Sequence, residues 1–324
     1  MTDSYGVVSG WVFGNDGYMG TAITKRGNKK LTWETTSEFN IGLDLGFFDN
    51  RISLSMEYYN RIISDLLVSN KSLPAYNEIN TIAANIGKTQ GRGFELTLST
   101  VNIMNKDWTW STDFTFYTFK DNWYERDPNW KPAAYESKKD PIRSYYSYVS
   151  DGLLQVGEKA PAWQPTLVPG QIKLKNLYDT GTSPNVLDQY DKVNLGSQDP
   201  KCTLGLNNTL RYKNLNFNIY FYGEIGRLRG ASYYDAWIVG LGNSLTNVSQ
   251  QSLHSYTNAN QNTTVPNLIE SAYDFGDYYH KKINYLRCRN ITLGYTIPVS
   301  KSIANSVRIS ANVSNPFVFT NWNG

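Results

Sequence analysis

The chain has 324 residues, of which 40% are hydrophobic and 14% aromatic, enough for one large domain or two ordinary ones. A formal net charge of +3 gives no sign of the concentrated basic face of a nucleic-acid-binding protein. No apolar run approaches the roughly 18 residues of a transmembrane helix. Two cysteines, Cys202 and Cys288, are too few for a disulfide scaffold. We expect them not to pair, because they fall in different predicted strands on opposite faces.

Apolar and polar residues alternate strictly in segments of about ten residues, the pattern of a β-strand with two different faces. In the first strong example, Ile52, Leu54 and Met56 alternate with Ser53 and Ser55. The predicted strands cover about residues 37–48, 51–62, 91–101, 108–120, 201–212, 215–226, 284–298 and 306–319, and the region before residue 37 has room for another. The polar face carries charged side chains, which a water-filled interior would explain: Arg51, Glu57, Glu95, Asp113, Arg211 and Arg308.

Short and long connections alternate along the chain. The short ones lie at about residues 49–50, 102–107, 213–214 and 299–305. The long ones cover about residues 63–90, 121–200 and 227–283. Outer-membrane barrels have short periplasmic turns and long extracellular loops, whereas a compact soluble domain rarely has links of this length. The pattern therefore predicts an all-β protein, an antiparallel transmembrane β-barrel segment of about 8–10 strands.

Aromatic residues gather toward the ends of the predicted strands: Phe47, Phe48, Trp108, Trp110, Phe317 and Phe319. An aromatic girdle at the membrane interfaces would explain them. Packing in a hydrophobic core or between hairpin strands would explain them equally well.

Several sequence blocks, spread in order over residues 31 to 298, resemble the SusC/RagA family of TonB-linked outer-membrane transporters, also called TonB-dependent receptors. The most characteristic block is Asn85-Ile86-Gly87-Lys88 followed by Gly91-Arg92-Gly93-Phe94-Glu95. The others are Leu31 to Glu34 with Asn40 to Asp44, Tyr58 to Arg61 with Asp65 to Leu67, Pro169 to Lys173, Leu195 to Ser197, Tyr212 to Leu215, and Tyr285 to Arg287 with Asn290 to Pro298.

The resemblance implies a location in the bacterial outer membrane and a larger barrel of 22 strands with an N-terminal plug. It implies import of oligosaccharides, or of peptides as the main competitor, together with a SusD-like surface lipoprotein. The TonB complex would act only through the plug. We expect this chain, residues 1–324, to be a partial barrel domain without the plug. Residues 1–5 show no secretory signal, and residues 319–324 stop short of a final strand ending in an aromatic.

No constellation of residues predicts catalysis, so we expect no enzyme activity and no cofactor. His254 and His280 both fall in a long loop, where a solvated histidine is the simpler interpretation. Asp179, Asp188 and Asp191 lie close in sequence but lack the dense oxygen ligands that Ca²⁺ prefers, so we expect no metal.

Aromatic residues are the candidate substrate-binding residues of the loops, because their faces suit the C–H faces of sugar rings. The candidates are Trp123, Tyr124, Trp130, Tyr145, Tyr146, Trp163, Tyr233, Tyr234 and Trp237. Packing of one loop on another, or against a partner lid, would also explain them.

Two other functions remain open from the sequence. The first is a small autonomous eight-stranded barrel that acts as an adhesin or a passive pore. The second is a secreted carbohydrate-binding β-sandwich, which would fold without detergent.

Overall fold

The computed structural model describes residues 3–14, 16–72, 81–178, 185–230, 250–267, 275–299 and 306–322. Strands dominate these residues, and the helices consist of two short 3-10 segments, η1 (Gln189–Asp191) and η2 (Gln250–His254). No helix in the described part of the chain is both long and apolar enough to span a membrane.

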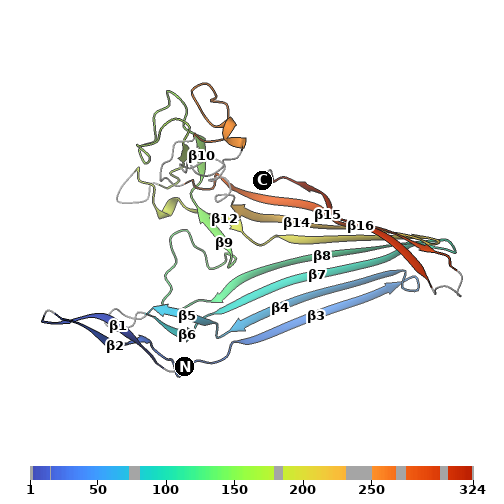
Figure 1. Cartoon of the computed structure of the whole chain (residues 1–324), viewed down its shortest axis with the longest axis horizontal. Coiled ribbons are helices and arrows are strands. Elements are labelled where there is room, and N and C mark those ends of the chain that lie inside the picture. Colours follow the sequence, from blue (N-terminus) through green and yellow to red (C-terminus); the bar gives the residue numbers. More distant parts are fainter. Residues whose placement is uncertain are drawn as a thin grey trace. The chain divides into compact units, whose positions relative to one another are not determined.

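Eight long strands form one antiparallel sheet (Figure 1). They are β3 (Thr35–Phe47), β4 (Ile52–Ser64), β7 (Lys88–Met104), β8 (Trp108–Glu125), β13 (Cys202–Tyr212), β14 (Leu215–Gly230), β15 (His280–Ile297) and β16 (Val307–Thr320). Their order in the sheet, β16-β15-β14-β13-β8-β7-β4-β3, follows the order of the chain. In such a meander, alternate connections lie at opposite ends, so the short turns share one end and the long links the other.

Tight turns fix the register at the short-turn end. Phe48, Asp49 and Asn50 all have positive φ, at 54°, 53° and 62°, between β3 and β4. Lys213, at φ 49°, begins the turn that sets Tyr212 opposite Leu215 in β13 and β14. These two strands then pair without a register shift from Tyr212 to Cys202. Because side chains alternate between faces, the regular register keeps one face apolar along neighbouring strands.

The apolar face of the sheet is exposed rather than packed. Leu293 is 48% exposed, Ile309 64% and Val313 54%, and no residue of β16 is buried. A soluble β-sandwich would cover this face with a second sheet. An exposed apolar face with a polar opposite face is what a lipid-facing barrel wall requires. The expected antiparallel sheet of barrel strands is therefore confirmed.

Several strands are longer than the alternation predicts, mostly toward the long links, although β7 also extends to Met104 at the short-turn end. Strand β8 continues to Glu125, β14 continues to Gly230, and β15 already begins at His280. The segment before residue 37 contains two strands, β1 (Ser4–Phe13) and β2 (Asp16–Lys25), which pair with each other. Neither cysteine forms a disulfide, and Cys288 is fully buried.

Contacts divide the chain into two compact units. Unit 1 comprises residues 1–41, 59–92 and 121–131. Besides the β1–β2 hairpin, it contains a second hairpin within the first long link, formed by β5 (Leu67–Ser72) and β6 (Thr81–Asn85). Unit 2 comprises residues 42–58, 93–120 and 132–324.

Within unit 2, the long links build a folded module of their own. Its strands are β9 (Ser144–Ser147), β10 (Ser150–Leu153), β11 (Ile172–Leu174) and β12 (Val193–Ser197), with β9 paired to β12 and β10 to β11. The buried cluster of Leu153, Ile172, Leu174 and Tyr256 lies here. We call this part, residues 132–178, 185–200, 250–267 and 275–279, the loop module. The long links are therefore not structureless. They form a buried hydrophobic cluster, whereas the apolar face of the sheet is exposed.

Candidate ligand-binding groove and loop module

The predicted loop aromatics that the structure describes lie in two places. Trp123 and Tyr124 end β8, and Trp130 lies just beyond it in unit 1. Tyr145 and Tyr146 lie on β9 and Trp163 between β10 and β11, all in the loop module. The remaining three, Tyr233, Tyr234 and Trp237, lie outside the described residues.

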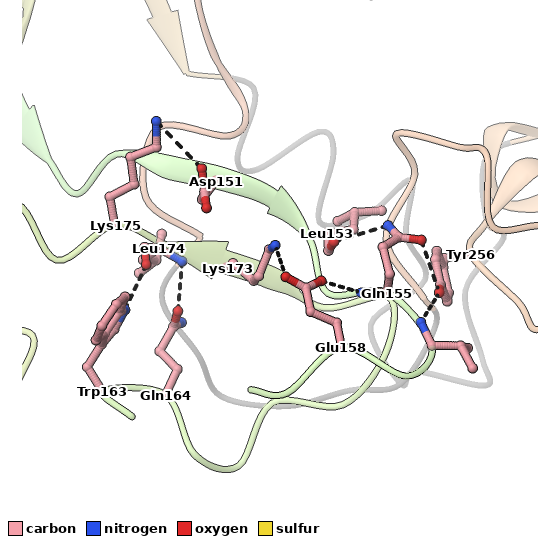
Figure 2. Close-up of polar contacts among 11 residues, drawn as sticks. Asp151, Leu153, Gln155, Glu158, Trp163, Gln164, Lys173, Leu174, Lys175 and Tyr256 are labelled. Carbon is pink, nitrogen blue, oxygen red and sulfur yellow. Dashed lines mark hydrogen bonds and ion pairs between the residues drawn. The ribbon is translucent and has the colours of Figure 1, made fainter. Parts of the chain in front are cut away.

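Trp163 has a structural contact inside the loop module (Figure 2). Its indole Nε1 donates a hydrogen bond to the carbonyl oxygen of Leu174 at 2.8 Å. The Leu174 amide donates to Oε1 of Gln164 at 2.7 Å. Two neighbouring side chains thus satisfy both backbone groups of a fully buried strand residue, which fixes the 161–171 loop to β11.

Tyr256, which sequence reasoning did not single out, connects the third long link to the same module. Its hydroxyl accepts a hydrogen bond from the Val156 amide at 3.0 Å and donates to Oε1 of Gln155 at 3.4 Å. Its side chain is 3% exposed. The residues lie about 100 positions apart in sequence, so no local pattern could reveal the contact.

An ion pair closes the turn between β10 and β11 (Figure 2). Lys173 Nζ lies 2.5 Å from Oε1 of Glu158, and the Gln155 amide donates to Oε2 of Glu158 at 2.9 Å. The hydrogen bond from Lys173 and then that from the backbone lower the pKa of Glu158 below its usual value. The charged carboxylate therefore stabilises the turn.

The two β9 tyrosines differ in their surroundings. Tyr145 stacks on His280, with 4.3 Å between ring centroids, beside an open pocket of about 210 Å³. The Tyr146 hydroxyl donates to Oδ2 of Asp140 at 2.7 Å, and its ring packs on Tyr135. Burial, and then the hydrogen bond and charge of Asp140, raise the pKa of Tyr146 to about 12.

Asp191, one of the three neighbouring acidic residues of the second long link, binds backbone amides. Asp191 is fully buried, and its carboxylate accepts hydrogen bonds from the amides of Leu177, Tyr178 and Asp188 at 2.6, 3.0 and 2.9 Å. Asp179 lies outside the described residues. Among the described residues, no group of three or more His, Cys, Asp or Glu side chains could hold a metal ion.

A groove of unit 1 lies around Arg126. Its guanidinium Cζ is 3.8 Å from the centre of the Trp130 ring and 5.4 Å from that of Trp123, two cation–π contacts. Arg126 directly follows the last residue of β8, Glu125. The groove has a volume of about 370 Å³ and is lined by Val68, Lys71, Ile86, Trp123, Arg126, Asp127, Asn129 and Trp130. We call it the Arg126 groove.

Sequence reasoning identified the two tryptophans of the Arg126 groove but not its cations. Arg126 sits three residues after Trp123 and four before Trp130, a spacing that could have suggested a stacked guanidinium. Lys71 and Ile86 come from the first long link, and only folding brings them to the same groove.

The sheet, its tight turns at one end and its folded links at the other define the wall of an outer-membrane β-barrel. The comparison with protein families agrees: the model described as "TonB dependent receptor-like, beta-barrel" matches residues 3–315. The chain belongs to this family, which places it in the bacterial outer membrane and among receptors rather than enzymes.

Curated relatives named as TonB-dependent receptors match nearly the whole chain. TonB-dependent receptor P3 of Formosa agariphila is 28% identical over 97% of this chain and 32% of its own length. TonB-dependent receptor SusC of Bacteroides thetaiotaomicron is 27% identical over 95% of this chain and 31% of its own length. The chain therefore spans about a third of the length of these relatives.

Solved structures share the fold. The RagAB peptide transporter superposes with a TM-score of 0.73 at 22% identity, covering 99% of this chain and 35% of the transporter chain. The RagAB peptide importer in its "open-open" state gives 0.75 at 21% identity with the same coverage. The resemblance to SusC/RagA-type TonB-dependent receptors is confirmed.

Proposed function

We propose that this chain is part of the barrel of an energised outer-membrane transporter that imports oligosaccharides, with oligopeptides as the competing substrate class. A SusD-like surface lipoprotein would cover the loops, and the TonB complex would act through a plug domain elsewhere in the whole protein. Substrate would be held between lid and barrel and released inward when TonB pulls on the plug.

The observation that carries the proposal is the asymmetry of the sheet. One end has turns of a few residues, and the other carries links that fold into a module with its own buried core. A passive pore needs only a closed wall and has no evident use for a folded superstructure. A module built on the long links suits the binding of a large substrate and a lid.

The loop aromatics divide according to their contacts. Trp163 contributes to the loop module's packing, so we do not assign it a substrate contact. Trp123 and Trp130 line an open groove, and Tyr124 is 54% exposed. These three, with Tyr145 beside its own pocket, are the proposed substrate-contacting residues.

Uptake by cells tests the proposal. A strain lacking the whole transporter gene is compared with the same strain complemented by it, using fluorescently labelled oligosaccharides and oligopeptides. Import that needs the gene, and that stops when the proton gradient is dissipated, is expected. Import that persists without a proton gradient would identify a passive pore. Absence of any gene-dependent uptake would refute transport.

The lid is tested separately by affinity purification of the full-length protein from outer membranes in mild detergent. A SusD-like lipoprotein in stoichiometric amounts is expected. Disruption of the loop module should release it, whereas a tagged transporter that purifies alone would contradict the proposed partner.

A further inference from the structure

We propose that the Arg126 groove binds a carboxylate group of the imported ligand. This rests on the proposed import function and adds to it a charge requirement on the substrate. The shared chemistry is a carboxylate, carried either by a uronic acid in an oligosaccharide or by an acidic residue in a peptide.

The argument begins with the arginine itself. Its Nε is buried and has no hydrogen-bond acceptor among the described residues. None of the ion pairs found among those residues includes Arg126 or Lys71. A buried donor without an acceptor costs free energy, and an external oxygen would recover it. A guanidinium is well suited to that ligand, because its planar fork matches a carboxylate.

The one acidic side chain of the groove is committed to the backbone. Asp127 Oδ1 accepts a hydrogen bond from the Asn129 amide at 2.8 Å, and the Asp127 carbonyl accepts one from the Trp130 amide at 2.8 Å. The resulting turn holds Trp130 against Arg126. With Lys71 also lining the groove, two cations face one carboxylate, so the groove keeps a net positive charge.

The shape favours an organic carboxylate over a small inorganic anion. A volume of about 370 Å³ is the size of a pocket for a ring or an amino-acid residue. Val68 and Ile86 add apolar surface, and Trp123 adds a flat aromatic edge. Such a site can contact the ring of a sugar or the side chain of a ligand amino acid while the arginine pairs with the ligand's carboxylate.

The test is isothermal titration of the purified full-length transporter in detergent with two matched pairs of probes. The first pair is trigalacturonate and its methyl ester. The second is the capped tripeptide Ala-Glu-Ala and its Gln counterpart. The variants are Arg126→Gln and Arg126→Lys. The matched control is Lys131→Gln, which removes one positive charge from an exposed residue just beyond Trp130 that does not line the groove.

We expect one charged probe to bind about tenfold more tightly than its neutral partner, the usual size of a charge-assisted hydrogen bond. Arg126→Gln should abolish that preference, Arg126→Lys should keep part of it, and Lys131→Gln should keep all of it. The pair that responds identifies the source of the carboxylate. Equal binding of charged and neutral partners, or a preference that survives Arg126→Gln, overturns the proposal.

The outcomes separate this proposal from the import function. If no probe binds while gene-dependent, gradient-dependent uptake continues, only the carboxylate requirement is overturned. If that uptake is also missing, the import function fails. Because the comparison of ester with acid changes the ligand and not the protein, it remains informative even if an arginine variant folds poorly.

Discussion

Asn208 and Trp110 are joined by a hydrogen bond on the mainly apolar face of the sheet, with the indole Nε1 of Trp110 3.1 Å from Oδ1 of Asn208. The hydroxyl of Thr112 donates to the same oxygen at 2.7 Å. Asn208 lies in the alternation of Leu206 and Leu210, where a lipid-facing residue is expected to be apolar. The asparagine is tolerated because its oxygen satisfies two donors on the neighbouring strand.

Replacing Asn208 with leucine should therefore destabilise the barrel even though leucine is the more apolar residue. The change leaves the Trp110 and Thr112 donors without their acceptor in a region poor in water, at a cost of about 1–2 kcal/mol in the free energy of unfolding. Urea unfolding of the full-length barrel in detergent, followed by its heat-modifiable gel mobility, measures this. In a Trp110→Phe background the penalty should shrink, and a leucine variant as stable as the wild type would contradict the explanation.

Gly170 should not tolerate a side chain. Its φ is +88°, and a Cβ atom there would lie 2.5 Å from Cδ1 of Tyr256 and 2.9 Å from Cβ of Asn267. Gly170→Ala should loosen the loop module, seen as faster proteolysis of residues 150–175, with about 2 kcal/mol lost from backbone strain and displacement of Tyr256.

Gly157→Ala is the matched control for this variant, because Gly157 has φ +81° but nothing within 4 Å of a built Cβ. An alanine at Gly157 would have the same unfavourable positive φ as one at Gly170, but its Cβ would collide with no neighbouring atom. Equal effects from the two alanines would show that Tyr256 does not pack tightly against Gly170.

The loop module should weaken in acid. The pKa of Glu158 is lowered by its bond to Lys173, so its charged form stabilises the fold at pH values above 4.5, the ordinary pKa of a glutamate. This contribution is lost as the pH falls through the lowered pKa. Hydrogen-exchange protection of residues 153–175 should decline over that range.

Glu158→Gln should remove the acid-dependent part of that decline. Lys175→Met serves as control, since Lys175 forms only a longer 3.5 Å pair with Asp151. If protection in the Glu158→Gln protein still falls as in the wild type, another carboxylate is responsible.

Tyr146 should remain neutral in alkali beyond the usual range of tyrosine. Burial and Asp140 raise its pKa from 10.0 to about 12, so the neutral phenol stabilises the fold below pH 10 and that contribution is lost as the pH rises through 12. The phenolate absorbance of the wild type minus that of Tyr146→Phe isolates this group. In the Asp140→Asn protein the difference curve should shift to lower pH, and an unshifted curve would exclude Asp140 as a cause.

Local pattern was sufficient to predict the sheet. Alternation such as Ile52, Leu54, Met56 has the two-residue period of a strand, and Lys213-Asn214 marks a turn, so strands, faces and pairing order follow from neighbours in the sequence. The family resemblance lay equally in short blocks such as Gly91-Arg92-Gly93. Strand ends were less predictable, because β14 and β15 extend beyond the alternation by pairing with each other through register shifts.

The loop module and the Arg126 groove were decided only by the tertiary structure. Tyr256 bonds to residues about 100 positions away, and Lys71 joins Trp123 and Arg126 from a different link. Composition indicated that aromatics in these links mattered, yet could not say that Trp163 faces a buried strand while Trp130 faces a guanidinium. Such contacts depend on which segments meet in space, and the meeting of distant segments leaves no periodic pattern in the sequence. The sequence by itself therefore determined the wall of the barrel, whereas folding decided which residues form its candidate binding site.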